Sequence, residues 1–448
     1  MPRASSLTSV HLDVGEEPRE LSRPEPDGPF RILLAGDFSA GASRIRKPVQ
    51  VDRDNFEDVL ELYKPEIRLV GGDSPVAISF REMEDFHPDS LFERLPLFRS
   101  LRDLRQQLKD GMVAFPKLEP KASGASLLAD MLGESAAVAP APTRNAWDSM
   151  IEDIVAPHIE PKQDPRQAGM ISQTDDAVTT GMRALLHCRP FQELEALWCA
   201  LFFLVRRLET STDLKVYVWD MPQSDLVGPD GLAALRRVMV EETVGTPGAD
   251  RWSVIAGLYY FGNEHESALS QIAAMSRAAG APFLSGVAKD SVVSGQLFPT
   301  LRQTPDARWL GLAMPRFLLR LPYGEKTGST ERFRFEEMPE VPEHESYLWG
   351  HPAVVCAYLL GEAFSRSGWD MRPGEVSQVE GLPAHVYQKD GEPELKPCAE
   401  VLLTESTAEL LMELGLMPLL SLKGSDRVRL ARFQSLAHPV AALNGPWQ

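Results

Sequence analysis

Residues 186–209 carry the clearest helical pattern in the chain. Their apolar side chains recur every three or four positions, as one face of an α-helix requires: Phe191, Leu194, Trp198, Leu201, Phe202 and Val205. Pro190 stands near the start, where its missing N–H costs nothing, and two arginines close the segment, as the helix dipole favours. Because positions 197–205 are apolar almost all round, we expect a core helix buried deep in the larger half of the chain.

Apolar runs elsewhere predict four buried strands, at 30–35, 214–219, 252–261 and 282–287. Helical patterns over 231–240 and 266–279 separate the last three of these runs. Strand and helix in alternation are typical of an α/β domain whose neighbouring strands run parallel. We therefore predict the α/β class, with mixed sheets flanked by helices. Two further helices are expected at 353–364 and 407–414, within an irregular extended rim.

The first part of the chain shows a separate set of local signals. Asp54 is a suitable N-cap for a helix over 55–63. Short apolar runs on either side of a glycine-rich turn predict a β-hairpin over 66–80. A helix is then expected to continue without a break over 91–108, and His87 ahead of it is expected to act in a cap or turn instead of in catalysis.

Residues 1–28 are polar and are expected to form a mobile arm. One short strand is predicted inside the arm, because apolar and polar positions alternate at Val10, Leu12 and Val14. Such a strand can add itself to the exposed sheet edge of a neighbour. The alternative is a disordered tail.

The composition changes after Phe115, where proline, alanine, serine and glycine dominate. We interpret 116–146 as a linker, whose roughly 30 residues span on the order of 30 Å. The linker divides the chain behind the arm into a first domain, 29–115, and a second domain, 147–448. The second domain is expected to open with a short amphipathic helix, a polar stretch to residue 174 and a helix from residue 176.

The linker contains one short apolar segment, 125–134, with helical spacing. Its apolar side chains lie on one side: Leu127, Leu128, Met131 and Leu132. An apolar helical turn inside a polar linker is typical of a docking peptide for a partner. The alternative is that this segment packs on its own domain.

Composition and charge narrow the functional classes. A chain of 448 residues is too long for one core, so two or three domains are expected. The net charge of −18 argues against a nucleic-acid-binding surface. The four cysteines have no CxxC spacing and are interpreted as reduced thiols. Since the longest apolar run has about nine residues and a membrane span needs about 20, we expect a soluble, cytoplasmic protein.

No residue pattern predicts a catalytic, cofactor-binding or metal-binding site, because the HExxH, GxSxG and GxGxxG motifs are missing. A run of acidic residues is interpreted as solvated surface: Glu336, Glu337, Glu340, Glu343 and Glu345. Arg316 and Arg320 are spaced by one helical turn beside this run. They are expected to form an internal or inter-subunit set of salt bridges.

Several segments together resemble the two subunits of the type VI secretion contractile sheath. Those that are similar to the small subunit are 30–39 (FRILLAGDFS), 51–60 (VDRDNFEDVL) and 85–95 (DFHPDSLFERL). Those that are similar to the large subunit, in its order, are 186–198 (LHCRPFQELEALW), 311–324 (GLAMPRFLLRLPYG), 347–350 (YLWG), 379–383 (VEGLP) and 414–419 (LGLMPL). The ordered set is specific, and the chain resembles a natural fusion of both subunits through the 116–146 linker.

The resemblance implies a structural protein and no chemistry. Protomers of the family assemble with other sheath subunits around an inner-tube protein on a baseplate, and contraction drives the tube outward to deliver effectors. Neighbours trade strands, which is the role that the arm would have. An AAA+ ATPase recycles the sheath by gripping a helix near the start of the large subunit, and 125–134 stands at the matching place. No cofactor, nucleic acid or membrane span is implied.

The sequence also departs from the family pattern. The usual large subunit continues well past a segment like 433–435, whereas this sequence stops at residue 448, so the resemblance predicts that the tail that supplies interlocking strands in the family is missing here. The family's Trp-Arg-Gly-Leu reads Trp-Cys-Ala-Leu at 198–201. The alternative function is a sheath-like adaptor or cap that nucleates or regulates a sheath or baseplate without polymerising. An enzyme, the third hypothesis, would need a deep pocket with converging polar groups.

Overall fold

A computed structural model describes residues 28–41, 47–69, 76–110 and 165–447. Its centre is a nine-stranded sheet with the order β11-β15-β14-β8-β7-β6-β1-β5-β2. These strands are β1 (Phe30–Gly36), β2 (Val49–Val51), β5 (Leu214–Asp220), β6 (Val254–Phe261), β7 (Phe283–Val287), β8 (Leu310–Met314), β11 (Gln378–Val379), β14 (Leu416–Ser421) and β15 (Val428–Leu430). From β14 to β5 the strands run parallel, and antiparallel strands close both ends. The predicted α/β class is confirmed.

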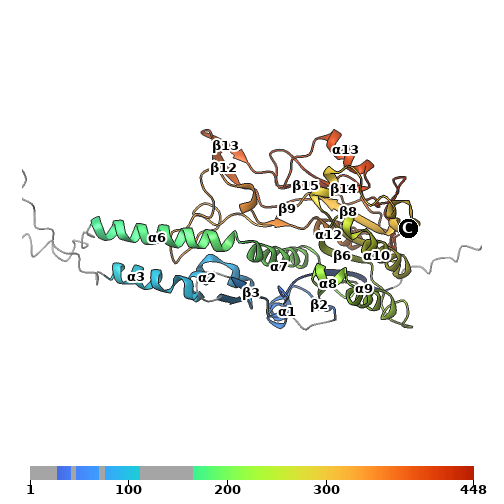
Figure 1. The fold of residues 1–448 in the computed structure, drawn as a ribbon, viewed down its shortest axis with the longest axis horizontal. Coiled ribbons are helices and arrows are strands. Elements are labelled where there is room, and N and C mark those ends of the chain that lie inside the picture. Colours follow the sequence, from blue (N-terminus) through green and yellow to red (C-terminus); the bar gives the residue numbers. More distant parts are fainter. Residues whose placement is uncertain (1–27, 42–46, 70–75, 111–164, 448) are drawn as a thin grey trace, which may run out of the picture.

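Helices and short turns surround the sheet (Figure 1). The described helices are α1 (Phe56–Tyr63), α2 (Pro88–Arg94), α3 (Arg99–Lys109), α6 (Pro165–Leu186), α7 (Arg189–Arg207), α8 (Gln223–Leu226), α9 (Pro229–Arg236), α10 (Glu266–Ala279), α11 (Lys289–Val293), α12 (Pro352–Ser367) and α13 (Glu405–Glu413). The described 3₁₀ helices are η1 (Met83–Phe86), η2 (Pro96–Phe98), η5 (Asn263–His265), η6 (Leu301–Gln303), η7 (Pro305–Trp309), η8 (His344–Ser346) and η9 (Gly368–Asp370), and η4 (Arg237–Glu241) is a π-helix. Three small two-stranded sheets pair β3 (Glu66–Leu69) with β4 (Val76–Ser79), β9 (Phe317–Leu318) with β10 (Trp349–Gly350), and β12 (Val386–Lys389) with β13 (Glu392–Leu395).

Strand β1 lies in the interior of the main sheet, although both of its neighbours come much later in the chain. It pairs in parallel with β5, where Phe30 is opposite Leu214, and with β6, where Ile32 is opposite Val254. All residues of β1 except Arg31 are buried. A run of this kind is what a strand covered on both faces requires. The first part of the chain therefore contributes a central strand to a sheet that the second part completes.

Successive residues of β1 face two different cores. Ile32 and Leu34 belong to the core that contains α7 and α12, whereas Leu33 and Ala35 belong to the core that contains α9 and α10. This alternation follows from the period of two in a strand. The sheet is thus held between a helical layer on each face.

Helix α7 confirms the helix predicted over 186–209, and it is packed from both parts of the chain. The Trp198 ring lies 5.4 Å from that of Phe38 and 5.9 Å from those of Phe56 and Tyr63, measured between ring centroids. The Trp198 indole N–H also donates to the Phe38 carbonyl at 2.9 Å. The helix therefore lies at the junction of the two parts, and not only within the larger one.

Two predictions for the first part of the chain are wrong in detail. Asn55, not Asp54, is the N-cap of α1, and its side chain makes no capping bond. The helix expected over 91–108 is interrupted between α2 and α3, where Leu95 is extended with ψ 131° because the residue before a proline avoids the helical region. The β3–β4 hairpin is confirmed, and so is the capping role of His87, whose Nδ1 accepts from the Asp89 N–H.

Helix α6 begins much earlier than the predicted start at residue 176. The polar stretch predicted to run to residue 174 is helical from residue 165, and polar side chains near its end are satisfied within helical geometry. Thr174 Oγ1 donates to the Met170 carbonyl at 2.8 Å, and the Asp175 carboxylate pairs with Arg105 of α3 at 2.6 Å. Helices α3 and α6 lie side by side and extend away from the sheet (Figure 1).

The predicted helices of the C-terminal region are confirmed as α12 and α13, but the prediction of an irregular rim is wrong, because this region supplies β8, β11, β14 and β15 to the main sheet and also contains a hairpin. Strands β12 and β13 are joined by Asp390 and Gly391, with φ of 53° and 84°. Positive φ at both central residues is the geometry of a type I′ turn, which an Asp-Gly pair favours. Among the described residues, no helix has the length and apolar character that crossing a membrane requires.

Candidate functional site

A cleft of about 1540 Å³ runs along the carboxyl ends of the parallel strands. β5 lies on one side of β1, and β6, β7 and β8 lie on the other, so the strand order reverses between β1 and β6. In open α/β sheets ligands bind beyond the strand ends at such a reversal. The polar residues that line this cleft include Asp37, Lys289, Arg316, Glu345 and Glu400.

Two carboxyl groups lie at the ends of β1 and β5. The Ser39 hydroxyl donates to Asp220 Oδ2 at 2.6 Å and the Ser39 N–H donates to Asp220 Oδ1 at 3.1 Å. Burial raises the pKa of Asp220, although the bonds from Ser39 act in the other direction. Burial also raises the pKa of Asp37, and the nearby charges of Asp225 and Glu193 add to that rise. Both groups hold their protons more tightly than an exposed aspartate does.

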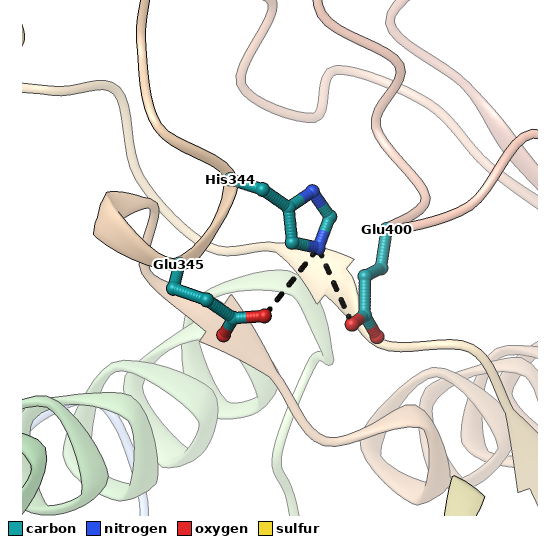
Figure 2. Close-up of side chains that lie close together, drawn as sticks. All are labelled: His344, Glu345 and Glu400. Carbon is teal, nitrogen blue, oxygen red and sulfur yellow. Dashed lines mark hydrogen bonds and ion pairs between the residues drawn. The ribbon is translucent and has the colours of Figure 1, made fainter.

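The outer rim of the cleft carries an ion cluster centred on Glu400 (Figure 2). Glu400 is almost fully buried and accepts from Arg316 at 2.8 Å and from Lys289. Arg316 also lies 3.2 Å from Glu345. Burial alone would raise the pKa of Glu400, but the bonds from Arg316 and Lys289 outweigh it and hold the pKa at about 2. The carboxylate is therefore charged at neutral pH.

His344, Glu345 and Glu400 lie close enough to suggest a metal site, since their ligand atoms fall within 4.8 Å of one another. The surroundings oppose that interpretation. His344 Nδ1 lies 3.3 Å from the Lys396 ammonium group and can only accept there, which places the ring proton on Nε2, the atom that faces Glu400 at 3.4 Å. A metal ligand must offer a free lone pair, and Lys289 and Arg316 already supply the positive charge. This group is an ion cluster.

A second cluster lies deeper, around Arg320. Its guanidinium bonds Glu195 of α7 at 2.6 Å and Glu337 at 2.8 Å, and both carboxylates are 1% exposed. His187 Nε2 lies 3.4 Å from Glu337. Two buried acids thus share one buried guanidinium, with an imidazole beside them. The guanidinium also stacks on Tyr323, with 4.3 Å to the ring centroid.

The two acids of this deep cluster respond differently. Burial would raise the pKa of Glu337, but the charge and bonds of Arg320, together with His187, bring it down to about 2. For Glu195, burial raises the pKa by more than Arg320 lowers it. As the pH falls, Glu195 therefore takes up a proton before Glu337 does.

These clusters settle the predictions for 316–345. The expected salt bridges of Arg316 and Arg320 are confirmed as internal ones, but the helical spacing is wrong because the segment between the two arginines is the strand β9. The predicted solvated surface is correct for Glu336, Glu340, Glu343 and Glu345, which are exposed. It is wrong for Glu337, which continues the alternation of buried Phe333 and Phe335, and that period of two was the available signal.

The partner-binding residues predicted from the sequence all lie outside the residues that the structure describes. These are the arm residues Val10, Leu12 and Val14 and the linker residues Leu127, Leu128, Met131 and Leu132. The short helix expected after the linker lies outside as well. They stay predictions.

Comparison with known proteins identifies the family. The family described as "EvpB/VC_A0108, tail sheath N-terminal domain" matches residues 168–294 and 291–437. The family described as "Type VI secretion system, VipA, VC_A0107 or Hcp2" matches residues 22–138. A relative, the "Type VI secretion system sheath protein TssC1" of Pseudomonas aeruginosa, is 30% identical over 304 residues, which are 60% of this chain and 61% of the relative.

This chain belongs to the type VI secretion tail sheath family. Within that family it is a fusion, in which a small-subunit-like sequence precedes a large-subunit-like sequence in one polypeptide. The resemblance seen in the sequence is thereby confirmed. The chain spans about three fifths of the length of the curated relative that it matches.

Proposed function

We propose that this chain is a structural protomer of a type VI secretion-like contractile sheath, which assembles with copies of itself or other sheath subunits around an inner tube in the cytoplasm. The observation that carries the proposal is the position of β1. This strand belongs to the small-subunit-like match, and it pairs with β5 and β6 of the large-subunit-like match. In a sheet of this kind, load applied to one part reaches the other through backbone hydrogen bonds.

The proposal includes the division of the chain into 29–115 and 147–448 as the two subunit-like portions, joined by 116–146. A covalent joint keeps the portions at a high effective concentration, so that pairing does not depend on two separate chains meeting. The aromatic contacts of Trp198 with Phe38, Phe56 and Tyr63 support this, since they add side-chain packing to the pairing of β1.

We propose further that the protein does no chemistry. The large cleft is the natural place for an active site, but several of its charged groups engage each other. Glu400 is bonded by Arg316 and Lys289, and Arg189 lies 2.7 Å from Glu193. Groups held in mutual ion pairs are poorly placed to act on a substrate. We interpret the cleft as a space left between the carboxyl ends of the strands and helix α7, and not as a substrate site.

Two segments of the chain are proposed to contact partners. The arm residues Val10, Leu12 and Val14 are proposed to add a strand to a neighbouring protomer, and Leu128 and Met131 to dock a recycling ATPase. Replacing Leu128 and Met131 by Asp should abolish capture of the chain by that ATPase. The same pair of changes should leave assembly intact, and unchanged capture would remove the docking role.

The decisive experiment is electron microscopy of the purified full chain, alone and with inner-tube protein. The proposal expects tubes, rings or short stacked oligomers. The alternative function, an adaptor or cap that does not polymerise, expects particles of one small size that still bind a sheath or baseplate component. A protein that stays monomeric and binds neither tube nor baseplate would contradict both.

A further inference from the structure

The surface around α13 combines an apolar groove with several exposed apolar side chains. The groove has a volume of about 730 Å³ and is lined mainly by Val292, Leu410, Leu414, Pro439 and Val440. Leu410 is 62% exposed and Val440 is 39% exposed, and Val293, next to Val292, is 87% exposed. These residues come from three separate parts of the chain. Apolar groups that gather in this way on a surface mark a contact site more often than scattered ones do.

Three carboxylates of like charge lie along α13 beside the groove, and Arg302 reaches only a backbone carbonyl at the end of this helix. Glu405, Glu409 and Glu413 recur every four residues along α13, which places them in a row beside Leu410 and Leu414. No lysine or arginine lies on this helix, and none of the three acids has an ion-pair partner in the described part of the chain. On α11, Lys289 is already bonded to Glu400.

This row of acids is unfavourable for the helix alone. Like charges four residues apart destabilise an isolated helix. Arg302 donates to the Glu413 carbonyl at 2.9 Å and so offsets the helix dipole at this end, but it forms no ion pair with the three described carboxylates of the row. A cationic partner laid along the row would offset the repulsion between these carboxylates. The charge pattern therefore selects an occupant with basic residues beside an apolar stripe.

We propose that the α13 groove is a docking site for a basic amphipathic helix of another protein. The apolar stripe of that helix would fill the space between Leu410, Leu414 and Val440, and its lysine or arginine residues would meet the Glu405–Glu413 row. A second copy that presents the same surface is a poor occupant, because it would bring a second Glu405–Glu413 row against the first. The wall formed by 438–440 follows the last residue of the family match, so this surface is partly outside the family pattern.

The test uses the full chain and two synthetic helical peptides with leucines at positions i, i+3 and i+7. One peptide carries lysines beside the leucines and the other carries glutamates in the same places. Fluorescence anisotropy should show binding of the lysine peptide, weaker binding at higher salt, and no binding of the glutamate peptide. Leu410→Asp should weaken binding of the lysine peptide by about tenfold or more.

Val386→Asp on β12 is the matched control, since Val386 is an equally exposed residue away from the groove, and it should bind the lysine peptide like the unchanged protein. Equal binding of both peptides, or binding that Leu410→Asp leaves unchanged, would overturn the proposal. A concentration-dependent dimer in sedimentation velocity that Leu410→Asp abolishes would assign the groove to a second copy instead. Sheath assembly is a separate readout and should survive Leu410→Asp.

Discussion

Arg316 and Arg320 come from one short stretch of chain, yet they work in two different electrostatic settings. Arg316 is part of the rim cluster, where its partner Glu345 is exposed and Glu400 also has Lys289. Arg320 lies in the deep cluster, where it is the guanidinium partner of both Glu195 and Glu337. Among the described residues, the other basic group that contacts these acids is the His187 imidazole. Because extended chain carries the two arginines about 13 Å apart on either side of β9, they meet different partners and face different costs when they are removed.

The contrast teaches what burial does to an ion pair. A buried pair is costly to form, but breaking it by removing one partner is costlier still, because the remaining charge stays in a poorly solvating environment. An exposed pair loses little when it is broken, since water and salt replace the partner. The deep cluster should therefore hold the 320–337 segment to α7. The rim cluster should lose less stability when one of its partners is removed.

The largest effect is expected for Arg320→Met. This change leaves two buried carboxylates without their guanidinium and should lower the free energy of unfolding by about 3–5 kcal/mol. Urea denaturation at pH 7, followed by tryptophan fluorescence, measures the loss. Arg320→Lys keeps the positive charge but cannot bond both carboxylates in the same geometry. Its loss in the free energy of unfolding should lie between zero and the loss of Arg320→Met. A loss below that of Arg316→Met would remove the distinction between the clusters.

The second effect is the response of the deep cluster to acid. The pKa of Glu337 is held at about 2, below its ordinary value of 4.5, so its charge stabilises the fold above about pH 4.5. That contribution should disappear as the pH falls from 4.5 towards 2. In Glu337→Gln the free energy of unfolding should be lower at pH 7 and should change less over this range. Parallel acid profiles for the variant and the unchanged protein would contradict the assignment.

Glu195 should show the opposite pH dependence. Burial raises its pKa above the unfolded value, so its contribution is fully present below the unfolded pKa and is lost as the pH rises through the folded pKa. Glu195→Gln keeps an oxygen that accepts from Arg320 and removes the surplus charge. The variant should therefore gain stability relative to the unchanged protein as the pH rises, by less than Arg320→Met costs. The exposed Glu193→Gln on the same helix is the control.

The smallest effect is expected for Arg316→Met, which should cost less than Arg320→Met because the buried Glu400 carboxylate keeps the bond from Lys289. Higher salt should shrink the difference further, since ions screen exposed charges. Thermal melts at low and high salt measure it. A loss that salt leaves unchanged would place this cluster in the same class as the deep one.

Local patterns in the sequence predicted much of the fold. The bounds predicted for the 266–279 helix are those of α10, and the apolar runs became β1, β5, β6 and β7. The break at Pro96 and the Asp390-Gly391 hairpin also had local signals, but they were not used. The pairing of the strands could not be predicted from local patterns, because the neighbours of β1 lie more than 180 positions away in the sequence.

The candidate site was less predictable for the same reason. That Arg320 forms salt bridges follows from its acidic surroundings in sequence, but Glu195 lies 125 positions away, on α7. Which acids are buried depends on how the 320–337 segment folds back onto that helix. The sequence shows the alternation that predicts burial of Glu337. It does not show which residues surround this side chain, because that depends on tertiary packing.

Native-state hydrogen exchange tests most directly whether both parts of the chain form one cooperative sheet. Amides of β1 and β6 should exchange with the same high free energy of opening, because each ladder depends on the other. Exchange of β1 through a low-energy opening, while β6 stays protected, would mean that the first part detaches alone and would contradict the account.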